Sequence, residues 1–336
     1  MPEQSGPPKS CANPIIQEAD LLIPLPEPLT VLLWLAAGAT SLFSLFGFLS
    51  HLDWKFELFS HFRTQYALLL AACLVVFLAS GELSGGLVAG LFLGVNLAQI
   101  LPIYRRTHRR NTGSKSYRLF FANILGTNTH TDQLILAIRK AEADILLLVE
   151  VRQHHLQQLL PALNDYPFQF SQPDVKNFGL AIFSRLPLES AQALALDEAC
   201  TPALVARLRP GKTPLTLLAI HPYPPKSRSH AAERNHQLKQ TAKFVSGQPG
   251  ELILAGDLNS TSWSHAFQQL VNESHLLDSR QGIGLQASWP AGNALMRVPI
   301  DHMLHTPGIT IHQRRLGQRT GSDHLPVIVD FSIEES

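Results

Sequence analysis

Three apolar runs near the N-terminus most constrain what this chain can fold into. They cover residues 29–49, 66–81 and 83–104. The first run has about 20 residues without a charge, which is the length at which a helix crosses the hydrocarbon core of a bilayer. A buried helical hairpin of a soluble protein is the alternative, but three successive runs bordered by Trp and Tyr are more typical of membrane helices. The sequence therefore predicts about three transmembrane helices within residues 29–104.

Charged residues beside these runs indicate an orientation. Lys55 and Arg63 lie between the first two runs, only Glu82 lies between the second and third, and an arginine-rich cluster follows at residues 105–110. The positive-inside rule then places the N-terminus outside and the large C-terminal part in the cytoplasm. The cluster beside a span suits lipid headgroups better than nucleic acid. We expect a multi-pass integral membrane protein, in the inner membrane if the source is bacterial, with the lipid bilayer as a partner.

The remaining segments divide the chain into further parts. Residues 1–28 contain several prolines and four acidic residues without a charged region leading directly into an apolar one. They predict a flexible N-terminal tail rather than a cleavable signal peptide. Residues 105–116 read as a basic linker, and residues 117–334 have the composition of a soluble domain. The three cysteines lack metal or redox spacing, and a net charge of +1 neither favours nor excludes nucleic acid.

The C-terminal part alternates short strand-like runs with fewer helical ones. Some of these strands follow each other without an intervening helix, which favours an α+β domain of two packed sheets flanked by helices. The strand-like runs are residues 118–123, 144–149, 179–184, 203–208, 215–220, 252–255, 298–305 and 327–331, and helical apolar spacing occurs at 131–141, 229–245 and 264–271.

Polar residues of one small set follow these apolar runs at six places. A single such residue would mean little, because Asp and Asn commonly start turns. Six places that share Asp, Glu, Asn and His are harder to explain by turns, since sheet edges can bring such residues together in a cleft. The residues are Asn123, Glu150, His221, Asp257 with Asn259, Asp301 with His302, and Asp323 with His324.

The chemistry that this set suggests is hydrolysis at phosphorus. Oxygen ligands such as Glu150 suit Mg²⁺ or Mn²⁺. A carboxylate such as Asp257 can deprotonate or orient a water molecule. The imidazolium form of His221 or His324 can stabilise a pentavalent transition state, and a further aspartate can fix the tautomer of a histidine. The set therefore predicts a divalent-metal-dependent phosphodiesterase or phosphatase.

In this order and spacing, the residues resemble the endonuclease/exonuclease/phosphatase superfamily with its DNase I-like fold. Its members include pancreatic-type deoxyribonucleases, abasic-site endonucleases, neutral sphingomyelinases and inositol-polyphosphate phosphatases. The resemblance covers about residues 117–334 and leaves the apolar region unexplained. It implies a four-layer α/β/β/α sandwich, in agreement with the two sheets expected from the strands. Together with the apolar runs, it predicts a membrane-anchored, bacterial-type member of the superfamily.

The resemblance also implies a role for each matching residue. Glu150 would be the principal metal ligand with Asn123 beside it, and Asp323 would be a second metal ligand or the partner of a histidine. The residues that would act on the phosphate are His221 and His324 as a pair, Asp257 as the group that orients water, Asn259 as a holder of phosphate or metal, and Asp301 as the support of a histidine. His302 is expected to be a buried supporting residue.

The substrate stays open between a phospholipid, a nucleic acid and a small phosphate ester. Lys226 and Arg228, in a proline-stiffened loop after His221, can contact the phosphate of any of these. Arg234 either reaches a substrate phosphate or lies on a solvated helix face. A DNA or RNA endonuclease is the alternative activity, and a membrane-bound scaffold with a decayed site is the alternative outside enzymes. Every expected polar position is filled, which argues against decay.

Overall fold

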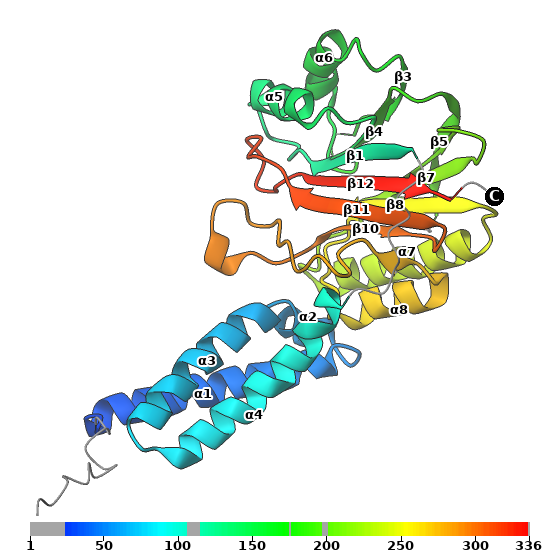
Figure 1. Ribbon diagram of the computed structural model, residues 1–336. Coiled ribbons are helices and arrows are strands. Elements are labelled where there is room, and N and C mark those ends of the chain that lie inside the picture. The colour runs from blue at the N-terminus through cyan, green and yellow to red at the C-terminus, as the bar shows by residue number, and fades with distance from the viewer. Residues whose placement is uncertain (1–23, 106–114, 175, 197–200, 335–336) are drawn as a thin grey trace, which may run out of the picture.

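The computed structural model describes residues 24–105, 115–174, 176–196 and 201–334. An elongated helical region comes first along the chain, and a larger domain of two sheets and four helices follows it (Figure 1). Most of the tail expected at residues 1–28 and of the basic linker expected at 105–116 lies outside the described residues.

The helical region consists of α1 (Glu27–Phe46), α2 (Trp54–Ser60), α3 (Arg63–Ala79) and α4 (Leu83–Ile100), with short 3-10 turns at Gly47–Leu49 and Leu101–Tyr104. A proline in its first turn starts α1. Gly81, at φ 81°, ends α3, and the next amide returns to the carbonyl of Phe77 at 2.9 Å. This is the Schellman arrangement, which turns the chain sharply into α4.

Among the residues that the structure describes, two helices are long and apolar enough to cross a membrane. They are Glu27–Leu49 with 23 residues and Leu83–Tyr104 with 22 residues. The second apolar run differs from expectation, because α2 and α3 form a pair bent by 57° that counts as a third span only if the pair is taken together. The bundle packs around a small cluster that includes Leu70 and Phe77, and most of its leucines point outward, for example Leu87 at 76% exposure.

In its described part, the larger domain contains two six-stranded sheets. One sheet has the order β11-β12-β1-β2-β4-β3 and the other β5-β6-β7-β8-β10-β9. The strands are β1 (Ser116–Asn123), β2 (Ile145–Val149), β3 (Phe168–Gln172), β4 (Leu180–Ser184), β5 (Leu188–Ala195), β6 (Pro202–Leu208), β7 (Leu215–Ile220), β8 (Glu251–Asp257), β9 (Leu277–Asp278), β10 (Asp301–His305), β11 (Ile309–Leu316) and β12 (Val327–Ile333).

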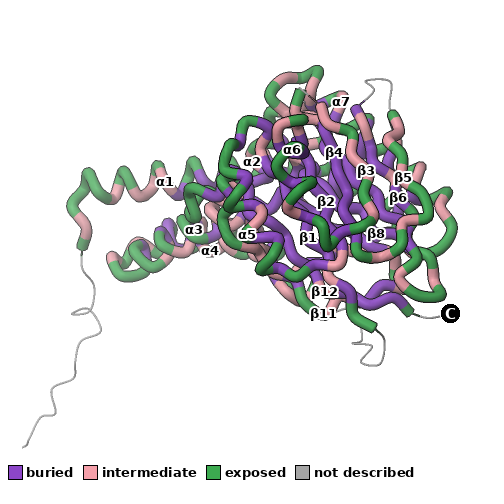
Figure 2. Tube along the Cα trace, turned by 90° about the horizontal axis from the view of Figure 1, so that it is seen from above, coloured by how far each residue is buried: buried purple, intermediate pink, exposed green. Residues whose placement is uncertain are grey.

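Helices cover the outer face of each sheet. Helices α5 (Thr131–Ala141) and α6 (Gln153–Ala162) pack on the first sheet, and α7 (Arg228–Ser246) and α8 (His265–Ser274) pack on the second. The main core lies between the sheets, so the domain has the four layers expected from the sequence. Figure 2 shows the buried strands enclosed by more exposed helices.

Central strands are buried on both faces. In β1, Leu119 and Phe121 face the core between the sheets, whereas Phe120 and Ala122 face α5 and α6. This explains why the run is apolar throughout rather than alternating. β1 pairs in parallel with β2, and β7 pairs in parallel with β8. The carboxyl ends of each parallel pair therefore meet at one edge of its sheet.

Candidate active site

The site lies where the carboxyl ends of β1, β2, β7 and β8 meet. Asn123 is the last residue of β1, Glu150 and His221 directly follow β2 and β7, and Asp257 ends β8. Asp301, at the start of β10, pairs with Asp257 in the antiparallel register. The two sheets thus bring together residues that are far apart in the sequence.

Asn123 joins two carboxylates from different sheets. Its Nδ2 donates to Oε1 of Glu150 at 2.9 Å and to Oδ2 of Asp257 at 3.0 Å. The other oxygen of Glu150 accepts the backbone N–H of Gly126 at 2.9 Å. Both carboxylates are buried. Two buried carboxylates within reach of one amide create a site of concentrated negative charge, which requires cationic partners.

His221 is one of those partners. Its Nδ1 lies 2.9 Å from the carbonyl oxygen of Asn177, so Nδ1 carries a proton and Nε2 faces the carboxylates. Nε2 is 3.5 Å from Asp257 and 3.8 Å from Glu150. Burial would lower the pKa of His221, but the two carboxylates outweigh it and hold the pKa above its ordinary value. The imidazolium is therefore favoured in this position.

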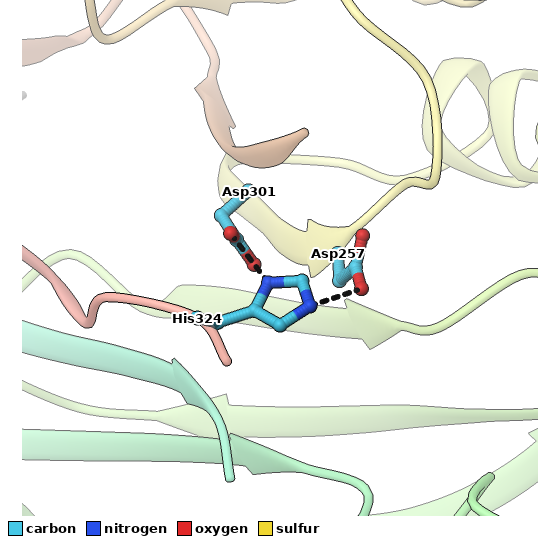
Figure 3. A group of neighbouring side chains, drawn as sticks. All are labelled: Asp257, Asp301 and His324. Carbon is cyan, nitrogen blue, oxygen red and sulfur yellow. Dashed lines mark hydrogen bonds and ion pairs between the residues drawn. The ribbon is translucent and has the colours of Figure 1, made fainter. Parts of the chain in front are cut away.

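His324 is the second cationic partner and lies between two aspartates (Figure 3). Its Nδ1 is 2.8 Å from Oδ2 of Asp301, and its Nε2 is 3.6 Å from Oδ2 of Asp257. Against the effect of burial, these carboxylates raise the pKa of His324 to about 10. Burial in turn would raise the pKa of Asp257, but His324 and His221 hold it well below the usual range. Asp257 is thus an ionised base between two imidazolium groups.

Asn259 and Asp323 complete the predicted set in different ways. Asn259 donates its backbone N–H to Oδ1 of Asp257 at 3.0 Å and its Nδ2 to the carbonyl of Pro222 at 3.0 Å. The side chain of Asp323 is 47% exposed, and its Oδ1 is 4.0 Å from Nε2 of His324. Asp323 therefore lies at the rim and Asn259 is half-buried, whereas the buried centre consists of Asn123, Glu150, His221, Asp257, Asp301 and His324.

Several supporting residues were not predicted. Ser288 donates its hydroxyl to Asp301, and Trp289 donates Nε1 to Asp323 at 2.9 Å. Ser322 donates to the carbonyl of Asn123 at 2.8 Å and accepts the backbone N–H of His324. Ser288 and Trp289 come from a loop without a strand-end pattern, so no local pattern marks them as site residues.

The side chains of His302 and Arg234 do not contact the carboxylates of the cluster but bind the backbone beside it, at Ser260 and Asn259. His302 is buried beside Arg280, and desolvation together with that guanidinium lowers its pKa to about 3, in keeping with the supporting role expected for it. Arg234 fits neither of its two expected positions, because it is fully buried and paired with Glu57 of α2.

The donor set fits a hard divalent cation. Ligand atoms of Asp257, Asp301 and His324 all lie within 4.8 Å of one another. Asp301 already binds His324 and Ser288, and Asp257 faces His221 and His324, which leaves Glu150 as the buried carboxylate to hold an ion. Carboxylate and amide oxygens are the ligands that Mg²⁺ and Mn²⁺ prefer.

Two packed sheets with carboxylates, an amide and two histidines at their shared edge define the DNase I-like class of phosphoester hydrolases. The model of the Endonuclease/Exonuclease/phosphatase family matches residues 119–324. The chain therefore belongs to this family, whose members depend on divalent metals. The match does not extend to the helical region.

Solved structures share the fold. TDP2 of D. rerio, complexed with single strand DNA product, is 18% identical with a TM-score of 0.57, and the match covers 65% of this chain and 99% of that chain. An endonuclease/exonuclease/phosphatase of Bacteroides vulgatus is 17% identical with a TM-score of 0.57, covering 66% and 100%. The human Nocturnin catalytic domain is 19% identical with a TM-score of 0.52, covering 65% and 95%. No curated protein matches the chain.

Proposed function

We propose that this protein is a membrane-anchored phosphoester hydrolase that depends on Mg²⁺ or Mn²⁺. The observation that carries the proposal is the buried cluster in which Asn123 joins Glu150 to Asp257, while His221 faces both carboxylates and His324 faces Asp257. Family membership supports the coarser statement that the chain is a metal-dependent hydrolase of phosphoesters.

Each residue has a part in the proposed reaction. Glu150 and Asn123 hold the cation, with Asp323 as a further ligand at the rim. A bound cation neutralises a phosphoryl oxygen and the charge that develops on the leaving group. Asp257, kept ionised by its neighbours, orients the attacking water and accepts its proton.

The remaining polar groups act on the phosphate. The imidazolium groups of His221 and His324 donate hydrogen bonds to phosphoryl oxygens, where negative charge grows in the transition state. Asp301 holds His324 through Nδ1, so Nε2 stays directed at Asp257 and the substrate. Asn259 helps to hold the phosphate.

Hydrolysis of a soluble bis-aryl phosphodiester by the full-length chain tests this proposal. Glu150→Gln removes the charge without changing the size of the side chain, and we expect kcat/KM at saturating Mg²⁺ to fall at least about 100-fold. Glu189→Gln, at a surface ion pair with Arg209, is the matched control and should stay within about twofold of wild type. Equal activity of wild type and Glu150→Gln, with or without Mg²⁺, would end the catalytic assignment.

The helical region supports the membrane anchor and an orientation. Helices α1, α3 and α4 all run the length of the bundle (Figure 1), so three crossings would put the N-terminus and the catalytic domain on opposite sides. Lys55 and Arg63 lie at the end of the bundle that contacts the catalytic domain, which the positive-inside rule assigns to the cytoplasm. A reporter fused to the C-terminus that is active only outside the cytoplasm would contradict this orientation.

A loop beside the site favours a substrate at the membrane surface, such as a phospholipid. Leu295 and Met296 are 79% and 46% exposed, and the segment that carries them joins Trp289 to β10. Gln65, in the first turn of α3, donates to the carbonyls of Leu295 and Arg297 at 3.1 Å and 2.9 Å. Two apolar side chains are thereby held at the level where α3 would enter the bilayer.

A DNA or RNA endonuclease is the second candidate activity, favoured by the likeness to TDP2, which has been solved with a single strand DNA product. Comparison of plasmid DNA, RNA and phospholipid vesicles as substrates decides between the two. Cleavage of nucleic acid alone would support the nuclease, and hydrolysis of vesicle lipid alone would support the lipid phosphoesterase. If no phosphoester were hydrolysed, a binding or scaffold module would be the remaining function.

A further inference from the structure

Helix α2 of the helical region packs directly behind the active-site turn, which we define as residues 257–261. Its Glu57 is buried, forms an ion pair with Arg234 of α7, and accepts a hydrogen bond from Oγ of Ser260 at 3.3 Å. His61, just after α2, lies 3.1 Å from the hydroxyl of Thr261 through Nδ1. The helical region thus contacts two consecutive residues of the turn.

Arg234 links Glu57 to the site itself. It is fully buried, and each of its three guanidinium nitrogens has a partner: Nη2 contacts Glu57, Nη1 donates to the backbone carbonyl of Asn259 at 2.8 Å, and Nε donates to Asn235 at 2.7 Å. A guanidinium is a rigid planar fork, so the carboxylate on one side fixes the direction of the N–H groups on the other.

The held carbonyl belongs to a residue in a left-handed conformation. Asn259 has φ 48°, a region that non-glycine residues occupy when surrounding contacts hold them there. Its backbone N–H donates to Asp257 and its side chain to Pro222. A shift of Asn259 would therefore move both the amide that faces the phosphate and the carboxylate that orients the water.

We propose that Glu57 is a positioning residue of the active site, which acts through Arg234 on the 257–261 turn, so that full activity requires the helical region to be docked. A buried ion pair is by itself weak evidence for stability, because desolvation of both charges offsets their attraction. Here the pair has a second consequence, since it aligns the donor that holds Asn259. The activity readout of this inference rests on the proposed function.

Steady-state kinetics of the full-length chain in lipid nanodiscs test the inference with three variants. Glu57→Gln removes the carboxylate charge, and Arg234→Lys keeps the charge opposite Glu57 but loses the fork that reaches Asn259. Asp53→Asn is the matched control, because it breaks the exposed ion pair with Arg228 at 2.7 Å between the same two helices and keeps the helix cap, since Asn also caps helices well.

We expect kcat on the soluble phosphodiester to fall about 10- to 100-fold in Glu57→Gln and Arg234→Lys, with KM within about threefold. Asp53→Asn should retain kcat within about twofold. A role limited to stability would lower the thermal midpoint but leave kcat unchanged below it. Wild-type kcat in Arg234→Lys, or an equal loss in Asp53→Asn, would overturn the inference.

Hydrogen–deuterium exchange provides a readout that needs no turnover. Peptides covering residues 257–261 should exchange several-fold faster in Glu57→Gln and Arg234→Lys than in Asp53→Asn, while peptides from α5 stay unchanged. Unchanged exchange in the turn would refute the positioning role even in an active enzyme. Faster exchange in a protein without hydrolase activity would support the linkage and refute the proposed function.

Discussion

Asp301→Asn is the substitution whose effect on catalysis follows most directly from the structure. Asp301 is buried and binds Nδ1 of His324 at 2.8 Å, while Ser288 donates to the same carboxylate oxygen. Asparagine fits the same space but removes the charge that, with Asp257, raises the pKa of His324 to about 10. A hydrogen bond to a charged group contributes about 1.5–3 kcal/mol, which corresponds to a loss of about 10- to 150-fold in kcat.

The pH dependence of kcat tests the same substitution, because the pKa of His324 determines the direction in which the profile shifts. The raised pKa keeps His324 protonated throughout neutral pH, so activity that needs the imidazolium is lost only as pH rises toward about 10. Without the Asp301 carboxylate the folded pKa drops, and the alkaline limb of kcat should move to lower pH. The assay is kcat on the soluble phosphodiester at saturating Mg²⁺ from pH 6 to pH 10.

Two comparisons make this prediction refutable. Asp330→Asn, at the ion pair of β12 with Arg118, controls for the same chemical change away from the site. In the background of His324→Gln, Asp301→Asn should cause little additional loss, because its partner is already absent. A kcat within twofold of wild type together with an unshifted alkaline limb would refute the role given to Asp301.

Three further outcomes follow from buried or exposed groups near the site. Burial and Arg280 lower the pKa of His302 to about 3. Its contribution to stability is therefore complete above about pH 6.5 and is lost as pH falls toward 3, at up to about 1.4 kcal/mol per pH unit. His302→Gln should flatten the pH dependence of the thermal midpoint between these pH values. Arg280→Met leaves the carboxylate of Asp278, whose side chain is only 11% exposed, without its partner and should lower the unfolding free energy by about 3 kcal/mol, measured by denaturant titration. Leu295→Ser with Met296→Ser should raise KM for phospholipid in vesicles several-fold and leave KM for the soluble diester unchanged, and equal KM values for vesicles would contradict a membrane-facing loop.

The strands that the sequence predicted are those in the interior of the sheets. The eight predicted runs correspond to β1, β2, β4, β6, β7, β8, β10 and β12, and the missed strands β3, β5, β9 and β11 are the four sheet edges. Interior strands are covered on both faces and read as continuous apolar runs. An edge strand such as β5 is largely exposed, so its sequence resembles that of a loop.

The same physical reason explains how much of the site was predictable. Asn123, Glu150, His221 and Asp257 directly end or follow interior strands, so the apolar run marks each one. Ser288 and Arg234 take their positions from tertiary contacts, and local sequence patterns do not predict such contacts. The pairing of Glu57 with Arg234 spans 177 positions and joins the helical region to the catalytic domain, which family resemblance did not cover.

The contacts between the two parts bear on how the site meets its substrate. The chain enters the catalytic domain at β1, yet the helical region binds the opposite sheet and its helices, through Asp53 to Arg228, Glu57 to Arg234, Gln65 to Arg297 and Gln99 to Trp263. Contacts spread over several elements oppose rotation of the domain about the single covalent connection. The active-site edge is therefore held at a fixed distance along the axis of the apolar bundle and in a fixed orientation relative to it. For the membrane-anchored hydrolase proposed above, this would mean that substrates are selected by where their phosphate lies as well as by their chemistry.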